Sequence, residues 1–392
     1  MIYRDDCLLI YRGIKASWHL CWEYPPRVTG GLGVACAGLV GALREVSRVE
    51  VWHPDVFCRS GEVDSSYSSY SASHLSEDFS EVVNSLLAGQ LAQGDSFWRQ
   101  VQQFAMDVVA NKPEEWMIVH AHDWHSLLAA VALKRRYGTE FIFHIHSTEL
   151  ERAGVQAQNS LYALEQWGMD EAARVICVSQ QSAQLVAEHY SISPSKLAVV
   201  HNGGEAVVCK ATLSNEVRTL LFAGRMCSQK APQFILEVMR RLRSRFTHLK
   251  LLMAGEGEYL EEIRSLVDFY CLSDCIEIFG MVPANRMLLI YKRADVLCLP
   301  SISEPFGLVA TEAAQHGLSV LLSDRCGVSE LLVSAPVIEQ GNVDQWVGAL
   351  ATLIAEPAQH RELARSVQKE AASHTWQDAA DEFLALYASF EN

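Results

Sequence analysis

Two glutamates eight positions apart, Glu304 and Glu312, lie in the segment S-E-P-F-G-L-V-A-T-E-A at residues 303–313. The preceding apolar run, residues 294–301, predicts a buried strand that ends at a proline. Gly307 frees the backbone after this break, and residues 308–315 have helix-forming composition. The pattern predicts a strand, a tight loop and a helix N-terminus, whose unpaired N–H groups suit a phosphate. Because carboxylates repel phosphate, both glutamates are better suited to accept hydrogen bonds from hydroxyls, and the segment indicates a sugar nucleotide.

Two cations follow another predicted strand, in the segment G-R-M-C-S-Q-K at residues 224–230. Arg225 and Lys230 together would neutralise a diphosphate and its charge as a leaving group. A glycine loop, T-G-G-L-G at residues 29–33, precedes a helix-like run, so backbone N–H groups at Gly30 and Gly31 could approach a phosphate or sugar closely. A pair of surface cations and a structural turn are the alternatives for these two segments.

Histidines cluster in two further segments, H-A-H-D-W-H at residues 120–125 and H-I-H-S-T-E at residues 144–149. Side chains alternate along a strand, so His144 and His146 share one face, and His146 at the strand end is the better site candidate. His144 fits a satisfied core histidine. The first segment, with Asp123, could hold a metal, but no second ligand cluster lies at metal spacing. We therefore expect no metal, and instead hydrogen bonds to sugar hydroxyls or polar support of a loop.

Apolar runs of strand length alternate with helix-like stretches along the chain. This alternation predicts strands buried on both faces of parallel sheets, in two successive series. The first series comprises residues 116–120, 141–146, 174–179 and 196–201, and the second comprises residues 219–225, 250–255, 276–280, 294–301 and 319–323. They predict an α/β protein of two doubly wound domains that join within residues 203–216. Because ligands bind at the carboxyl ends of such strands, one shared site is expected in the cleft between the domains.

Length and composition limit the classes of protein to which this chain can belong. The 392 residues suffice for two domains, each able to bury a core. A formal net charge of −15 disfavours nucleic acid and anionic membranes as partners. No run has the length of a membrane span, about 20 apolar residues, the N-terminus has no secretory signal pattern, and the eleven cysteines are scattered. These features predict a reduced, cytoplasmic protein without stable membrane insertion, and they predict nothing about its oligomeric state.

Taken in order, the motifs resemble those of family 4 glycosyltransferases, with the bacterial glycogen-synthase-like members most similar. The shared motifs are E-Y-P-P-x-x-x-G-G-L-G, H-A-H-D-W, H-I-H-S-T-E, V-V-H-N-G, G-R-x(4)-K and S-E-P-F-G-L-V-A-T-E-A. The resemblance implies a GT-B fold, in which two Rossmann-like domains face a central cleft. It implies an acceptor-side domain at residues 1–205, a nucleotide-sugar-binding domain at 206–373, and a last helix at 374–392 that crosses back to the first domain. It also implies retention of the anomeric configuration, without a metal or another cofactor.

The resemblance also assigns roles to individual positions. It implies that Arg225 and Lys230 bind the diphosphate, that Glu304 faces the donor sugar, and that Glu312 binds the ribose. His146 matches the histidine beside the reacting centre and completes the expected catalytic set of His146, Arg225, Lys230 and Glu304. The other expected contacts are the phosphate-facing Gly30 and Gly31, the loop residues Phe306, Gly307 and Leu308, and Asp123 on the acceptor side.

The chain departs from the family pattern at one informative position. Bacterial glycogen synthases carry a lysine two positions before the paired glycines, where this chain has Val28, which argues against polymerisation from ADP-glucose. We expect a hexosyltransferase that uses a UDP-, GDP- or ADP-linked sugar and a hydroxyl acceptor such as a saccharide or glycan precursor. A sugar-nucleotide epimerase of GT-B architecture and a non-catalytic sugar-nucleotide-binding protein are the alternatives.

Overall fold

The computed structural model describes residues 16–54, 96–112, 117–205 and 216–389. The chain forms two compact units, of which the first comprises Met1–Gly203 with Trp376–Asn392 and the second comprises Gly204–Thr375. The sequence predicts boundaries after residues 205 and 373, and the contacts divide the chain after Gly203 and Thr375. Most of the predicted junction, residues 206–215, lies outside the described residues.

The first unit is built on a six-stranded parallel sheet in the order β2-β1-β3-β4-β5-β6. Its strands are β1 (Ala16–Leu20), β2 (Arg48–Trp52), β3 (Ile118–His122), β4 (Phe141–Ile145), β5 (Arg174–Cys177) and β6 (Leu197–Val199). Its α-helices within the described residues are α2 (Gly31–Arg44), α4 (Ser96–Ala110), α5 (Leu127–Tyr137), α6 (Glu149–Ala153), α7 (Ser160–Glu171), α8 (Gln180–His189) and α15 (Trp376–Ala388). Strands β1 and β4 are buried along their whole length, as expected where helices cover both faces of a sheet.

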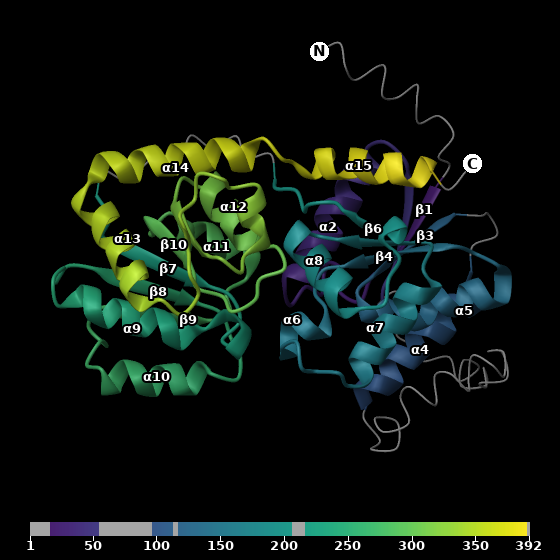
Figure 1. Cartoon of the computed structure of the whole chain (residues 1–392), viewed down its shortest axis with the longest axis horizontal. Helices are drawn as coiled ribbons and strands as arrows, with labels where there is room; N and C mark the ends of the chain where they lie inside the picture. The colour runs from purple at the N-terminus through teal and green to yellow at the C-terminus, as the bar shows by residue number, and fades with distance from the viewer. Residues whose placement is uncertain (1–15, 55–95, 113–116, 206–215, 390–392) are drawn as a thin grey trace, which may run out of the picture. The chain divides into compact units, whose positions relative to one another are not determined.

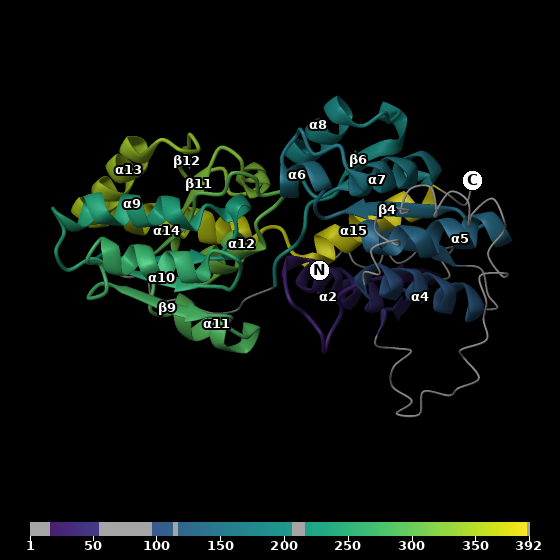
Figure 2. The same cartoon turned by 90° about the horizontal axis from the view of Figure 1, so that it is seen from below.

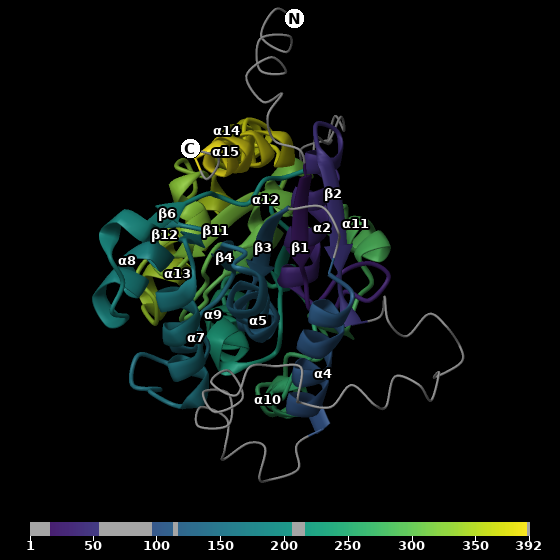
Figure 3. The same ribbon diagram turned by 90° about the vertical axis from the view of Figure 1, so that its right-hand side faces the viewer.

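The two faces of this sheet differ in chemistry. Figures 1 and 3 show α15 on one side of the sheet and α4, α5 and α7 on the other. The main apolar core includes Trp98 and Phe104 of α4, Leu127 of α5, and Phe141 and Phe143 of β4. The side chains that alternate with Phe141 and Phe143 along β4 include a buried histidine, so the opposite face is partly polar.

The last helix, α15, packs against α2 within the first unit. The two helices approach closely because position 38 of α2 is glycine, and a Cβ there would lie 2.1 Å from Cε2 of Trp376. Phe383, Leu384 and Tyr387 of α15 are at most 2% exposed. The apolar side of the C-terminal helix is therefore part of the core of the first unit.

The second unit holds another six-stranded parallel sheet, in the order β12-β11-β10-β7-β8-β9. Its strands are β7 (Thr219–Ala223), β8 (Lys250–Ala254), β9 (Ile276–Gly280), β10 (Val296–Leu299), β11 (Ser319–Ser323) and β12 (Val337–Ile338). Its α-helices are α9 (Pro232–Arg243), α10 (Leu260–Phe269), α11 (Ala284–Tyr291), α12 (Leu308–Gln315), α13 (Val343–Ala355) and α14 (Pro357–Ala372). Figures 1 and 2 show α12 and α14 on one side of this sheet and α9 and α10 on the other. The strand order reverses between β7 and β10, and ligands of doubly wound sheets bind at the carboxyl ends of such a pair.

Both units have the doubly wound parallel α/β architecture that the sequence predicts, so the predicted fold class is confirmed. Among the described helices, none combines the length and the apolar character needed to span a membrane.

Candidate functional site

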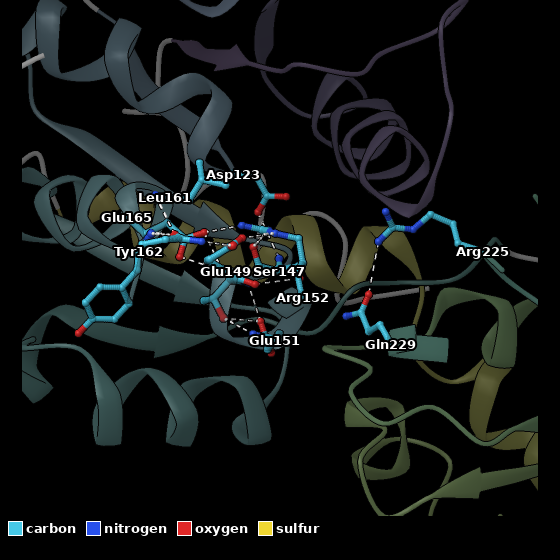
Figure 4. A network of polar contacts seen from close by, with 12 residues as sticks. Asp123, Ser147, Glu149, Glu151, Arg152, Leu161, Tyr162, Glu165, Arg225 and Gln229 are labelled. Carbon is cyan, nitrogen blue, oxygen red and sulfur yellow. Dashed lines mark hydrogen bonds and ion pairs between the residues drawn. The ribbon is translucent and has the colours of Figure 1, made fainter. Parts of the chain in front are cut away.

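The candidate residues of the second unit gather where its strand order reverses. Lys230 ends a short 3-10 helix, η6 (Ser228–Lys230), after β7, and Glu304 lies in the loop after β10. Nζ of Lys230 lies 2.5 Å from Oε2 of Glu304, and the two side chains are only 14% and 11% exposed. Arg225 is exposed, and its guanidinium donates to Oε1 of Gln229 at 3.4 Å (Figure 4). The structure thus joins the lysine predicted to bind diphosphate to the glutamate predicted to face the sugar.

The loop after Glu304 leads into α12. Gly307 at its N-cap has a φ of 112°, and a Cβ there would lie 3.2 Å from Val328 and 3.3 Å from Glu304, so the local structure requires glycine. Phe306 is buried, and no side chain of the described residues caps the turn that begins at Leu308. The uncapped N–H groups make this an electropositive helix end, the feature that binds phosphate in many proteins.

Glu312, further along α12, accepts a hydrogen bond from the hydroxyl of Tyr291 at 2.6 Å. Burial raises the pKa of Glu312, and the bond from Tyr291 opposes that shift. The Tyr291 ring also stacks on His316, with ring centroids 5.1 Å apart. A carboxylate has about four acceptor positions, so Glu312 retains acceptor capacity for ribose hydroxyls. Tyr291 was missed by sequence reasoning, since it lies on another helix, α11, and belongs to no motif.

In the first unit, Asp123 holds the backbone that follows β4. Its Oδ1 accepts the N–H of His146 at 2.7 Å and that of Ser147 at 3.3 Å. Asp123 has a φ of 55°, which is uncommon outside glycine. Burial raises the pKa of Asp123 to about 6, and the nearby guanidinium of Arg152 opposes this shift. These bonds position His146, whereas the acceptor-side role of Asp123 stays a prediction.

Arg152 of α6 ties the same segment to a neighbouring helix (Figure 4). Its guanidinium lies 2.7 Å from Glu165 and 3.3 Å from Glu149, and it donates to the carbonyl of Ser147 at 2.5 Å. Burial raises the pKa of Glu165 to about 7, against the lowering effect of Arg152. Tyr190 donates to the same carboxylate at 2.6 Å. Glu165 and Tyr190 carry no sequence signal, because only the fold brings α7 and the end of α8 to Arg152.

His146 is half-buried at the end of β4, and its imidazole is neutral at neutral pH. Its Nε2 lies 3.0 Å from Nδ1 of His122, and burial lowers its pKa to about 3. His146 therefore offers a hydrogen bond and not a positive charge. His144, for which the sequence favours a core position, is 1% exposed.

Gly30 and Gly31 open α2 beside the carboxylate of Glu23. Glu23 accepts the N–H of Gly30 at 3.1 Å, the N–H of Thr29 at 3.1 Å and the hydroxyl of Thr29 at 2.5 Å. A Cβ added at Gly30 or Gly31 would meet no atom of the described residues within 4 Å, so their packing does not require glycine at either position. Space for a ligand is therefore present, but the Gly30 N–H already has an anionic partner. Gly31 is the better candidate of the two for phosphate contact.

The fold also gathers potential metal ligands that lie far apart in the sequence. Among the described residues, three groups have ligand atoms within 4.8 Å of one another, and all three include His122. The groups are His19, His120 and His122; Cys21, Cys36 and His122; and His122, His144 and His146. Spacing along the chain could not reveal these groups, so the expectation of a metal-free site stays a prediction.

Comparison with known proteins assigns both units. Residues 29–205 match the family model described as Glycosyltransferase Family 4, and residues 210–373 match the one described as Glycosyl transferases group 1. Glycogen synthase of Mycobacterium tuberculosis is 26% identical over 391 residues, which cover 93% of this chain and 92% of the relative. Sucrose-phosphate synthase from Thermosynechococcus elongatus superposes with a TM-score of 0.76 at 17% identity, over 96% of this chain and 99% of the other. Anabaena HepE in complex with UDP-glucose gives a TM-score of 0.69 at 16% identity, over 96% and 99%.

Proposed function

Because this chain belongs to the family 4 glycosyltransferases and has the GT-B fold, we propose that it transfers a hexosyl group from a nucleotide-diphosphate sugar to a hydroxyl acceptor. In this proposal the donor is UDP-, GDP- or ADP-linked, and the acceptor is a saccharide or glycan precursor. The anomeric configuration is retained, and no metal is needed. The observation that carries the proposal is the ion pair of Lys230 with Glu304 where the second sheet reverses its strand order.

This ion pair suits an exchange of partners when a donor binds. Lys230 and Glu304 are largely shielded from water, and an unpaired charge in such a place costs several kcal/mol. A diphosphate that takes the place of Glu304 keeps the ammonium paired, and Glu304 is then free to accept hydrogen bonds from sugar hydroxyls. The uncapped start of α12 supplies further N–H donors. When the C1–O bond to the diphosphate breaks, Lys230 and Arg225 stabilise the charge that develops on the leaving group.

The first unit contributes a neutral and well-positioned His146. Asp123 fixes its backbone N–H, and Arg152 fixes the carbonyl of Ser147, the next residue. A group held in this way loses little entropy when substrate binds, which is the physical basis of catalysis by positioning. The name of one similar protein, glycogen synthase, supports a saccharide as the acceptor.

A donor screen by thermal unfolding tests the donor class. A ligand present at 100 times its Kd adds about 2.7 kcal/mol to the free energy of unfolding. The stabilisation by UDP-, GDP- and ADP-glucose, each measured in the presence of EDTA, therefore ranks the three donors. We expect one nucleotide to stabilise the protein, and Lys230→Ala to abolish that shift. Lys250→Ala is the matched control, because Lys250 is an exposed lysine at the amino end of β8.

Release of the nucleoside diphosphate distinguishes a transferase from the alternatives. Release that depends on an added saccharide supports transfer, and the anomeric configuration of the product, read by NMR, tests retention. Release without any acceptor, accompanied by a new free sugar, would indicate an epimerase. Conversion of the donor into a second sugar nucleotide, without release, would also indicate an epimerase. A protein that binds the donor but forms neither free diphosphate nor a second sugar nucleotide would be a non-catalytic binder.

A further inference from the structure

One face of the first sheet is rich in histidine and also carries a cysteine. The five rings lie on, or directly after, the neighbouring strands β1, β3 and β4, and they are His19, His120, His122, His144 and His146. Cys21 directly follows β1, and its N–H continues the pairing with β2 by donating to the carbonyl of Trp52 at 2.9 Å. Because side chains alternate along a strand, Cys21 shares this face with His19.

Two cysteines and one of these histidines are close enough to share a metal ion. Sγ of Cys21, Sγ of Cys36 on α2 and a ring nitrogen of His122 lie within 4.8 Å of one another. All three residues are fully buried. Around a tetrahedral zinc ion, sulfur and nitrogen ligand atoms lie about 3.5–3.8 Å apart. Small adjustments of the side chains therefore allow one ion to contact all three atoms.

The two thiols distinguish this group from the two groups that consist of histidine alone. A divalent ion in a buried place needs anionic ligands, because an uncompensated charge there is very costly. Two thiolates neutralise the ion, whereas three neutral imidazoles leave both of its charges uncompensated. Thiolates also favour zinc over magnesium, calcium and manganese, which prefer oxygen ligands.

Ring stacking gives a second reason to set aside the group of His19, His120 and His122. The rings of His120 and His122 are stacked, with an interplanar angle of 4° and centroids 4.3 Å apart. The lone pair of an imidazole nitrogen lies in the plane of its ring. An ion bound by both rings would have to lie in both planes, and two stacked parallel planes have no point in common.

We propose that Cys21, Cys36 and His122 bind one structural zinc ion, and that His19 is the fourth ligand. In the sheet, His122 lies between β1 and β4. Its Nε2 lies 3.0 Å from Nδ1 of His19, on the β1 side where Cys21 also lies, so this nitrogen faces the thiols. Two nitrogens on a tetrahedral zinc are about 3.4 Å apart, so a small movement lets the ion replace this hydrogen bond.

The outer nitrogens of both histidines have partners of the kind that orient zinc ligands. Nε2 of His19 lies 3.2 Å from Oγ of Ser17, and Nδ1 of His122 lies 3.0 Å from Nε2 of His146. A ligating histidine commonly donates its other N–H to such a neighbour, which fixes the ring. Binding also balances in protons and charge. Two thiol protons leave for solvent as two Zn–S bonds form, and each ligating histidine keeps one proton, on its outer nitrogen.

The ion joins three elements of the first unit. Cys21 follows β1, His122 ends β3, and Cys36 lies in the second turn of α2, the helix that Gly31 begins. The zinc therefore fixes the start of α2, and with it the glycine loop, to the carboxyl ends of two strands. None of the four ligands belongs to the expected catalytic set, so this proposal does not rest on the proposed function.

Metal analysis of the full-length protein tests the site. The protein is produced without a histidine tag in medium that contains zinc, and it is purified without a chelator. We expect one equivalent of zinc per chain by elemental mass spectrometry, and its loss in Cys21→Ser and in Cys36→Ser. Cys177→Ser is the matched control and should keep the zinc, because Cys177 is a fully buried cysteine of the same unit outside the three groups. A wild-type protein without zinc would overturn the proposal.

Cobalt substitution identifies the ligands in the wild type, so it does not depend on the folding of a variant. Protein refolded with Co²⁺ should show thiolate-to-cobalt charge-transfer absorption together with the visible bands of tetrahedral cobalt. Bound cobalt without the charge-transfer absorption would overturn the proposal. His144→Asn should keep the ion, since His144 belongs only to a group of histidines. Loss of the ion in this variant, with retention in Cys36→Ser, would assign the metal to that group instead.

Two further measurements test the details of the site. Ser17→Ala removes the outer partner of His19 and should lower the zinc affinity, measured by competition with a chelator, about 10- to 100-fold. An unchanged affinity would overturn the assignment of His19. Non-reducing mass spectrometry of the purified wild type should find Cys21 and Cys36 as free thiols after the metal is removed. A disulfide between them would overturn the proposal, because it consumes both anionic ligands.

Discussion

Lys230 and Glu304 neutralise each other at 2.5 Å in a place where we expect a charged ligand. In the proposed reaction, replacing Lys230 by alanine removes one preorganised cation from the leaving group, and the loss of one such group costs about 2.7–4 kcal/mol. We therefore expect Lys230→Ala to lower kcat 100- to 1000-fold, and Lys250→Ala to leave it unchanged. Steady-state kinetics with and without EDTA measure both points. Loss of wild-type activity in EDTA, with recovery on adding magnesium or manganese, would contradict a metal-free reaction.

Substitutions of Glu304, in the loop after β10, and of Glu312, on α12, should have separable effects. Glu312 lies beside Tyr291 on the helix, whereas Glu304 contacts Lys230. If Glu312 binds the ribose as proposed, Glu312→Gln should weaken binding of the free nucleoside diphosphate, because the ribose loses a charged acceptor. If Glu304 faces the donor sugar as proposed, Glu304→Gln should not weaken that binding but should impair transfer. Titration calorimetry with the diphosphate alone decides, and equal weakening in both variants would refute this division of roles.

Glu165 makes stability depend on pH in a predictable direction. Its pKa rises from 4.5 to about 7 on folding, so the folded state binds the proton more tightly than the unfolded state. Its contribution favours folding at low pH and is lost as the pH rises from 4.5 to about 7. Glu165→Gln removes this dependence, so the variant should gain stability relative to the wild type across that range. Urea unfolding at several pH values measures the difference in the free energy of unfolding between the variant and the wild type. Glu188→Gln is the control, because Glu188 is exposed. A difference for Glu165→Gln that does not vary with pH would contradict the prediction.

At this scale, motifs predict the candidate residues but not the tertiary partners that the structure gives them. The pairing of Lys230 with Glu304 is consistent with their positions after two strands that are neighbours of the reversal point, β7 and β10. His19, Tyr291 and Glu165 were not singled out, because each joins the candidate residues only through tertiary contact. A lone histidine in the strand A-S-W-H-L carries no signal until the register aligns it with His120.

The contact between α2 and α15 depends on Gly38. A Cβ at this position would lie 2.1 Å from the Trp376 ring, so Gly38→Ala forces the two helices apart and should cost about 1–3 kcal/mol, as overpacking typically does. Gly41→Ala, in the same helix, meets no atom within 4 Å in the part of the chain that the structure describes and should stabilise the protein by about 0.5–1 kcal/mol. Urea unfolding of both variants checks the opposite signs. Equal effects would show that α15 does not depend on this close approach.

Elements with a strong apolar pattern were predicted most accurately. The predicted strands at residues 276–280 and 319–323 and the helical segment at 308–315 coincide with β9, β11 and α12. Strands β1, β2 and β12 were not predicted. β1 contains serine and histidine, β2 contains arginine and glutamate, and β12 has two residues, so none shows a continuous apolar run. Their pairing in the sheets outweighs a weak local preference.

At the scale of the whole molecule, removal of α15 should destabilise the first unit and leave the stability of the second unit unchanged. A chain that ends at Thr375 lacks Phe383 and Tyr387, which are buried in the first unit, whereas the second unit keeps all its elements. We expect calorimetry of this truncated protein to show an earlier transition for the first unit. The later transition should still shift upward with nucleoside diphosphate, as the second unit carries the predicted donor residues. A single transition unchanged from the wild type would mean that α15 adds nothing to the first unit.

The order of elements along the chain has a consequence for synthesis on the ribosome. The second unit is one continuous stretch, but the first is interrupted by it and is completed by α15. At about 5–20 residues per second, Tyr387 emerges roughly 10–40 s after Gly203. During that interval α15 is absent. The histidine-rich sheet face of the nascent first unit and the small residues of α2 are therefore uncovered. The unit translated first is thus the last that can reach its native state, and its uncovered face is the surface that a ribosome-associated chaperone would have to shield.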